Sequence, residues 1–174
     1  MKDFDLRKYL AENKLLKEEI ELADKVQKGL GEPTLTKDKK RIEVMLNSGL
    51  SSDNNTSINQ SVDGVGLYRT EISFLLIHRF PSEEEQVQQY QTVLERYPLK
   101  QVVMRTLDVG GDKPLPYLPI EEDNPFLGWR GIRFTLDHPD IFLMQVRAMM
   151  RASSGHENLS ILLPMISGVK ELDD

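Results

Sequence analysis

Four short apolar runs along the chain predict β-strands, and the segments between them predict helices. The runs cover residues 41–46, 64–68, 102–107 and 159–163. All but the first contain few polar residues, as expected of strands that are buried on both faces of a parallel sheet. Strands that alternate with helices indicate βαβ units, so the pattern predicts an α/β fold with a parallel sheet.

Two of the helices between these strands have clear sequence signals. Ser82 and Glu85 have the spacing of a capping box, in which both side chains satisfy backbone N–H donors at a helix start. Apolar residues continue this helix at Val87, Tyr90, Val93, Leu94 and Tyr97. Pro139 suits the first turn of the second helix, whose predicted buried stripe comprises Ile141, Phe142, Gln145, Val146, Met149 and Met150.

The N-terminal thirty residues have the pattern of a charged helix with a narrow apolar stripe. Its apolar positions are Leu6, Leu10, Leu16, Ile20, Ala23, Val26 and Leu30. Gly31 and Pro33 are expected to end it. We therefore expect a helical linker over residues 1–32 and a domain over residues 33–174. The polar segment 51–61 has poor helix propensity and predicts a loop or a short helix.

The composition narrows the function classes. The chain has 174 residues, 22 Lys and Arg, 28 Asp and Glu, and a net charge of -6, which argues against general nucleic-acid binding. It has no cysteine, which excludes disulfides, thiolate zinc sites and a cysteine nucleophile. No apolar run approaches the roughly 20 residues that span a bilayer. We therefore expect a cytoplasmic protein that makes no membrane contact.

Arginines follow two of the predicted strands. Arg69 comes directly after the strand at 64–68, and Arg105 lies near the end of the strand at 102–107. Ligands gather at the carboxyl ends of strands in parallel α/β folds, and a guanidinium group matches phosphate and carboxylate oxygens. With Arg130 as a third candidate, the pattern favours a small, multiply charged anion as ligand. Solvated arginines, or arginines paired with acids, are the alternative.

The segment Thr106–Lys113 places charge at a sharp turn. Gly110 and Gly111 permit close backbone approach, and Asp108 is a candidate to hold Arg105 or another arginine in one rotamer. The spacing is not that of a Walker loop. His78, His138 and His156 lack metal-ligand spacing, and the acidic stretch Glu121–Asp123 is expected to be solvated.

Three longer motifs resemble Enzyme I of the bacterial phosphotransferase system, the phosphoenolpyruvate-protein phosphotransferase family. They are GVGLYRTE at 64–71, RTLDVGGDK at 105–113 and NPFLGWRGIR at 124–133. The stretches at 145–153 and 163–166 also match, in the same order. The sequence at 119–124 and 136–142 resembles the nitrogen-related form of Enzyme I more closely than the sugar-transport form.

The resemblance implies a fold and a substrate site. In this family a (β/α)8 barrel binds phosphoenolpyruvate (PEP) and Mg2+, and the phosphoryl group passes to a histidine on a separate domain and then to a small phosphocarrier protein. The matched motifs imply that Arg69 and Arg105 bind the phosphate of PEP. Arg130 and Asp108 are implied to support the same pocket.

The departures from the family pattern imply a part of the barrel. A full barrel needs about 250 residues, whereas residues 33–174 hold about four β/α units, so we expect the N-terminal part of a TIM barrel. The family's magnesium ligands, its catalytic cysteine and its phosphohistidine motif have no match here. We therefore expect no catalytic and no metal-binding residue in this chain, no phosphotransfer by the chain alone, and a linker at 1–32 from the absent phosphohistidine domain.

Two alternatives and one consequence follow from this interpretation. Pyruvate phosphate dikinase shares the Arg-Thr-Glu strand, but the motif at 105–113 favours Enzyme I. A noncatalytic interaction module, acting through its N-terminal helix or a sheet edge, is the alternative from a different class.

Half a barrel leaves sheet edges unpaired, and such edges favour pairing with another chain, so we expect a homo-oligomer.

Overall fold

The computed structural model describes residues 34–49 and 61–173, which belong to two compact units. In the smaller unit, β1 (Thr34–Leu35) and β2 (Arg41–Ile42) form an antiparallel hairpin. Its turn is closed by the backbone N–H of Lys40, which donates to the Thr36 hydroxyl at 2.9 Å. The predicted helix at 1–30 and nearly all of the polar segment at 51–61 lie outside the described residues.

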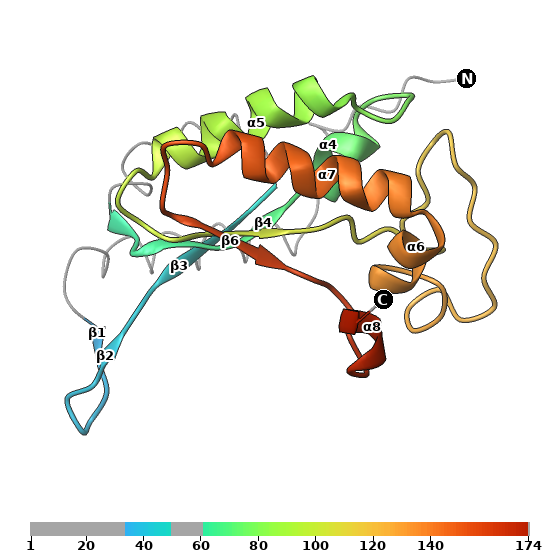
Figure 1. The fold of residues 1–174 in the computed structure, drawn as a ribbon. Helices are drawn as coiled ribbons and strands as arrows, with labels where there is room; N and C mark the ends of the chain where they lie inside the picture. Colours follow the sequence, from blue (N-terminus) through green and yellow to red (C-terminus); the bar gives the residue numbers. More distant parts are fainter. Residues whose placement is uncertain (1–33, 50–60, 174) are drawn as a thin grey trace, which may run out of the picture. The chain divides into compact units, whose positions relative to one another are not determined.

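The larger unit contains a four-stranded sheet in sequential order (Figure 1). Its strands are β3 (Met45–Ser48), β4 (Gly64–Arg69), β5 (Val102–Arg105) and β6 (Leu159–Leu162). All three neighbouring pairs are parallel. The predicted parallel α/β fold is therefore confirmed for this part of the chain.

The prediction for the first strand was wrong in its position. The run at 41–46 is divided: Arg41 and Ile42 are exposed in the hairpin, and the parallel strand begins only at Met45. Arg41 and Glu43 carry charges that a parallel strand cannot bury, so only the apolar end of the run joins the sheet. Asp63 holds the start of this strand by accepting from the N–H of Val44 at 2.8 Å.

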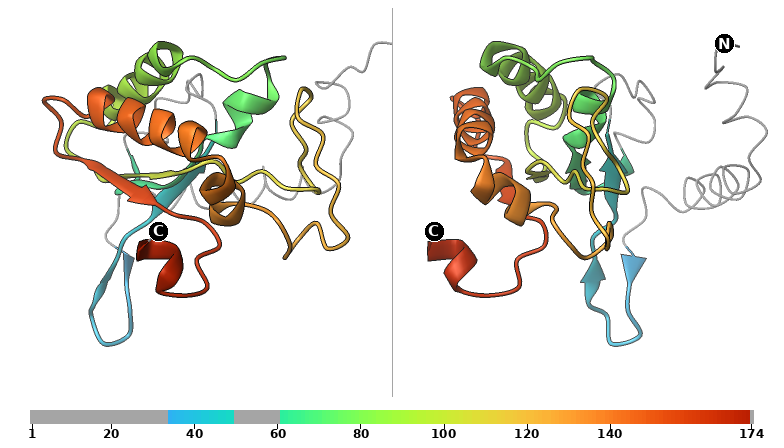
Figure 2. Two further views of the ribbon diagram at one scale, coloured as in Figure 1. Left: turned by 45° about the vertical axis from the view of Figure 1, so that its right-hand side comes forward. Right: turned by 90° about the vertical axis from the view of Figure 1, so that its right-hand side faces the viewer.

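Two long helices cover one face of the sheet (Figures 1 and 2). Helix α5 (Glu83–Arg96) connects β4 to β5, and α7 (Pro139–Ala152) connects β5 to β6, and the two pack side by side. Parallel crossovers are right-handed, so strands added in one direction place their helices on one side. The short helices α4 (Glu71–Leu75), α6 (Ile132–Asp137) and α8 (Lys170–Asp173) complete the unit.

The apolar stripe of α5 is confirmed, whereas that of α7 needs a correction. All five predicted α5 residues are buried. On α7, Met149 is buried but Met150 is exposed, and Gln145, Ala148 and Ala152 complete the inner face. Positions 145, 148, 149 and 152 share one side of a helix, and Met150 lies about 100° further round.

The predicted capping box at the start of α5 is present in full. The Ser82 hydroxyl accepts from the N–H of Glu85 at 3.3 Å, and the Glu85 carboxylate accepts from the N–H of Ser82 at 2.8 Å. Arg79 also donates to both oxygens of this carboxylate, from Nη2 to Oε1 at 2.5 Å and from Nη1 to Oε2 at 2.8 Å. Hydrogen bonds from Arg79 first, and from Ser82 next, lower the pKa of Glu85 to about 2.

This lowered pKa predicts an acid-dependent loss of stability. The ordinary pKa is 4.5, so the contribution of Glu85 is complete above pH 4.5 and declines as the pH falls towards 2. Chemical unfolding of the unchanged chain and of Glu85→Gln is the measurement. We expect the stability difference between them to shrink below pH 4.5. The matched control is Glu95→Gln at the other end of α5, and a Glu85 difference that is constant with pH would contradict the prediction.

Candidate functional site

Arg69 and Arg105 are neighbours at the carboxyl ends of two central strands. They are direct partners in the parallel register of β4 and β5, one position beyond the pair Tyr68 and Met104. The Tyr68 hydroxyl accepts from Gln89 of α5 at 2.9 Å, so that pair faces the helices. Side chains alternate along a strand, and both arginines therefore project from the opposite face of the sheet.

Arg105 is held by two carboxylates. One guanidinium nitrogen lies 2.5 Å from Glu71 Oε1, and the other lies 3.1 Å from Asp108 Oδ2. The side chain of Glu71 is only 1% exposed and that of Arg105 is 17% exposed. Lys113 adds a second positive charge, with Nζ 4.0 Å from Glu71 Oε1. These contacts give the Arg105 side chain one defined position.

Arg130 is a buried arginine that shares Asp108 with Arg105. Its Nη2 lies 3.1 Å from Asp108 Oδ1, and its Nη1 lies 2.9 Å from Asp112 Oδ1. Burial alone would favour a neutral side chain, but the two carboxylates outweigh it and raise the pKa of Arg130 above its usual value. Asp108 thus bridges two arginines, with one oxygen on each.

Arg69 differs from the other two arginines in its surroundings. Within the part of the chain that the structure describes, no carboxylate forms an ion pair with it, and its buried Nε has no hydrogen-bond partner. Arg105 Nε and Glu71 Oε2 are also buried without a partner. Buried polar atoms are satisfied in most proteins, so this edge of the sheet has hydrogen-bonding capacity left for a ligand.

The loop before Arg130 is organised by Glu122. Its neighbours Glu121 and Asp123 are exposed, as expected of a solvated acidic stretch, but Glu122 is engaged with the backbone. Its carboxylate accepts from the N–H of Asn124 at 3.0 Å and of Trp129 at 2.9 Å. These backbone hydrogen bonds lower the pKa of Glu122. A Cβ at Gly128 would overlap that carboxylate. The acid therefore shapes the turn that delivers Arg130 to the site.

Gly110 supplies the close approach that the sequence predicted. A Cβ at position 110 would lie 2.8 Å from Cβ of Arg130, closer than packed atoms tolerate. Beneath this turn lies a cluster of buried apolar side chains. Its members are Phe74, Leu107, Val109, Leu115, Ile120 and Phe134. The cluster supports the chain segments that carry Arg105, Asp108 and Arg130.

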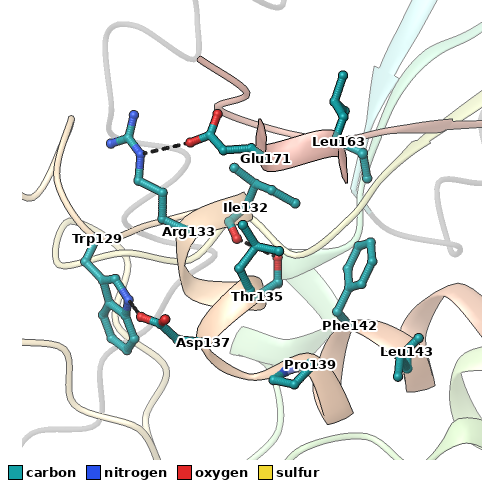
Figure 3. Close-up of a pocket in the computed structure, with 12 residues that line it drawn as sticks. Trp129, Ile132, Arg133, Thr135, Asp137, Pro139, Phe142, Leu143, Leu163 and Glu171 are labelled. Atoms are coloured by element: carbon teal, nitrogen blue, oxygen red, sulfur yellow. Dashed lines mark hydrogen bonds and ion pairs between the residues drawn. The ribbon is translucent and has the colours of Figure 1, made fainter. Parts of the chain in front are cut away.

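A pocket of about 670 Å³ lies away from these arginines (Figure 3). It is bordered by α6, the start of α7 and α8, and the apolar side chains Ile132, Phe142 and Leu163 line it. Arg133 and Glu171 lie at its border, with Nε and Oε1 3.9 Å apart. None of Arg69, Arg105 and Arg130 lines this pocket.

Two features of the described residues bear on metals and membranes. Residues 34–49 and 61–173 contain no group of three His, Asp or Glu side chains placed to hold a metal ion. Glu71, Asp108 and Asp112 are already paired with arginines, so the acids at this edge do not fit a magnesium site. Over the same ranges, no helix combines the length and the hydropathy of a membrane span.

Sequence reasoning assigned no role in binding to Glu71, Asp112 or Gln145. Glu71 and Asp112 stood inside the quoted motifs at 64–71 and 105–113, so their proximity to Arg69 and Asp108 was the available signal. Gln145 stood in the predicted buried stripe of α7. A glutamine at such a position signals a buried hydrogen-bond network, since a buried amide needs partners.

The arginine pair at the carboxyl edge of a parallel sheet agrees with a comparison against known families. The family model described as "PEP-utilising enzyme, PEP-binding domain" matches residues 23–174. The chain belongs to this family.

Several members of the PEP-utilising family are similar to the chain along most of its length. It is 55% identical over 161 residues to proteins named phosphoenolpyruvate-dependent phosphotransferase system from Salmonella typhimurium and Escherichia coli. It is 46% identical over 156 residues to phosphoenolpyruvate-protein phosphotransferase from Bacillus subtilis. These alignments cover 92% and 88% of the chain, which spans 22% of the first two relatives and 27% of the third. The names agree with the Enzyme I resemblance rather than with a dikinase.

The shared carboxylate predicts a large effect of one substitution on stability. Asp108→Asn leaves Arg105 and Arg130 close together without the charge between them, and we expect it to lower the free energy of unfolding by about 3 kcal/mol. Urea unfolding measures this change. Asp123→Asn, an exposed acid in the same connection, is the control and is expected to change stability by less than about 0.5 kcal/mol. Equal effects of the two substitutions would contradict the conclusion that Asp108 stabilises the fold by pairing with both arginines.

Proposed function

We propose that the chain forms part of the PEP-binding domain of an enzyme of the Enzyme I type. That enzyme transfers the phosphoryl group of PEP to its own histidine and then to a small phosphocarrier protein. The observation that carries the proposal is the adjacency of Arg69 and Arg105 at the carboxyl ends of β4 and β5. The relatives named phosphotransferases support it.

In this proposal Arg69 and Arg105 bind the phosphate of PEP. A phosphate has oxygens for both guanidinium groups, and arginine matches them in a fixed fork. The charge of Arg105 is already offset by Glu71 and Asp108. Arg69 therefore supplies the uncompensated positive charge, and Arg105 supplies direction through its unused Nε. Asp108 holds Arg105 in position and is itself held by Arg130.

The chain's contribution to catalysis is then substrate positioning. Phosphoryl transfer depends on holding the group in line and on stabilising its spread negative charge. Two adjacent, partly buried arginines serve both needs. We assign the acceptor histidine and the magnesium ion of the reaction to parts of the enzyme other than the described residues, and no catalytic residue to this chain.

We extend the proposal to the domain and its setting. Residues 33–174 are the first four or so β/α units of a TIM barrel, and residues 1–32 are the helical linker to a phosphohistidine domain. Sequential strand order with helices on one face supports a barrel, since a doubly wound sheet covers both faces. The sequence at 119–124 and 136–142 supports the nitrogen-related form. We also propose that the protein is cytoplasmic.

The proposal predicts how PEP binds to variants of the chain. In a two-dimensional NMR titration, PEP is expected to shift signals at the carboxyl ends of β4 and β5, at lower concentrations than sulfate does. Arg69→Ala and Arg105→Ala are each expected to weaken PEP binding at least about tenfold, the loss of one strong charge-assisted contact. Arg147→Ala, an exposed arginine on α7, is the control. PEP binding no stronger than sulfate binding would contradict the proposal.

We also propose that copies of the chain associate through the open side of the sheet. Among the described strands, β6 pairs only with β5. Leu162 at its end is 37% exposed and lies opposite Arg105 in the register, on the face away from the helices. An edge and an apolar side chain in this position favour pairing with a second sheet.

Sedimentation velocity tests this association over a wide concentration range. We expect the average mass to rise with concentration, because each copy has the same β6 edge, which pairs only with β5 among the described strands. Leu162→Lys places a charge on that face and is expected to shift the chain towards monomer. Leu99→Lys, at the highly exposed Leu99 outside the sheet, serves as the control. A monomer at every concentration would contradict the proposal.

A further inference from the structure

Gln145 is a buried polar residue that the substrate site does not touch directly. It lies on the inner face of α7 and is 0% exposed. Its Nε2 donates to the Thr70 hydroxyl and to the Tyr90 hydroxyl, each at 3.1 Å. Its Oε1 accepts from the N–H of Leu107 at 2.8 Å. Both ends of the amide are therefore engaged, as a fully buried amide requires.

The partners of Gln145 belong to the two segments that carry the site. Thr70 lies between Arg69 and Glu71, and its hydroxyl donates to the carbonyl of Arg105 at 2.7 Å. Leu107 is the residue before Asp108. One side chain thus holds the junction of β4 and α4 and also the chain that leaves β5.

The contact with Leu107 satisfies a backbone N–H just beyond the end of β5. The last bond between β5 and β6 joins the N–H of Thr106 to the carbonyl of Leu162 at 3.0 Å. Beyond that bond the chain turns away towards Asp108, and Gln145 accepts the next buried N–H along the chain, that of Leu107. A buried N–H left without a partner is costly, so Gln145 stabilises the chain where it leaves β5.

Gln145 is itself anchored on the side away from the site. The Tyr90 hydroxyl, which accepts from it, donates to Gln86 Oε1 at 3.0 Å. Gln86 Nε2 in turn donates to the carbonyl of Pro81 at 3.1 Å. Burial raises the pKa of Tyr90 well above its usual value, so the hydroxyl keeps its proton. It can therefore go on donating to Gln86 while it accepts from Gln145. The network links α5, α7 and the ends of β4 and β5.

We infer that Gln145 is a positioning residue that sets the Arg69–Thr70–Glu71 segment against the Arg105–Asp108 segment. The inference rests on the proposed function for its consequence, since the two guanidinium groups must converge on one phosphate. Binding that depends on two fixed groups is sensitive to small displacements, and a shift of about 1 Å can cost on the order of a hundredfold. Gln145 acts through Thr70 and Leu107.

The test compares two glutamines of one network. Gln145→Met removes the links to Thr70 and Leu107, whereas Gln86→Met removes a buried amide that is joined to Tyr90 and Pro81 only. Both variants are expected to lose stability in urea unfolding. Only Gln145→Met is expected to weaken PEP binding, by about tenfold or more. Thr70→Val removes the link to Gln145 together with the bond from Thr70 to the Arg105 carbonyl, with little change in volume. Combined with Gln145→Met, it should weaken binding no further than the stronger single variant.

A second measurement needs no PEP. The NMR signal of the Arg105 Nε–H group, assigned with Arg105→Lys, is expected to shift or broaden in Gln145→Met and in Thr70→Val and to stay in place in Gln86→Met. If the unchanged chain binds no PEP, the proposed function fails while this signal still decides the role of Gln145. If Gln145→Met does not fold, Thr70→Val decides it.

Two results would overturn the inference. One is an Arg105 signal that is the same in Thr70→Val and in every folded Gln145 variant as in the unchanged chain. The other is equal disturbance by Gln145→Met and Gln86→Met, in the signal or in PEP affinity, because general loosening of the core would then explain the effect.

Discussion

Asp108 places one carboxylate oxygen on Arg105 and the other on Arg130, and the carboxyl edge of the sheet depends on this shared charge. Two guanidinium groups brought together away from water repel each other strongly. A carboxylate between them turns that repulsion into two attractive contacts. Each arginine has a second carboxylate partner, Glu71 for Arg105 and Asp112 for Arg130. Arg105 and Arg130 can therefore lie close together beside the carboxyl end of β5.

The arrangement leaves Arg69 as the exception. Its register partner Arg105 is held by acids, while Arg69 has no carboxylate partner among the described residues. An anion arriving at this edge would meet one uncompensated charge and one pre-oriented donor. In the function proposed above, this combination of charge and direction would favour a multiply charged anion such as phosphate. The acids fix the position of Arg105, whereas no acid among the described residues forms an ion pair with Arg69.

Sequence reasoning placed Arg69 and Arg105 at neighbouring strand ends, as the structure has them, because their positions follow from local rules. Apolar runs predicted strands, parallel strands end at a common edge, and an arginine at each strand end was visible in the chain. The capping box at Ser82 and Glu85 was equally local, and the structure has it in full. The division of the run at 41–46 was missed because pairing partners decide it. Arg41 and Ile42 pair with β1, whereas Met45 to Ser48 pair with β4.

The sequence by itself determined the parallel α/β class, the two long helices and the strand ends that carry arginine, because periodicity and caps are properties of neighbouring residues. Only the tertiary structure decided which acid holds which arginine, and that Glu122 shapes the turn before Arg130. It alone decided that Gln145, 75 positions from Thr70 along the chain, joins the two site segments. Such contacts depend on helix packing against the sheet, and a single sequence carries no direct record of distances between residues far apart in the chain.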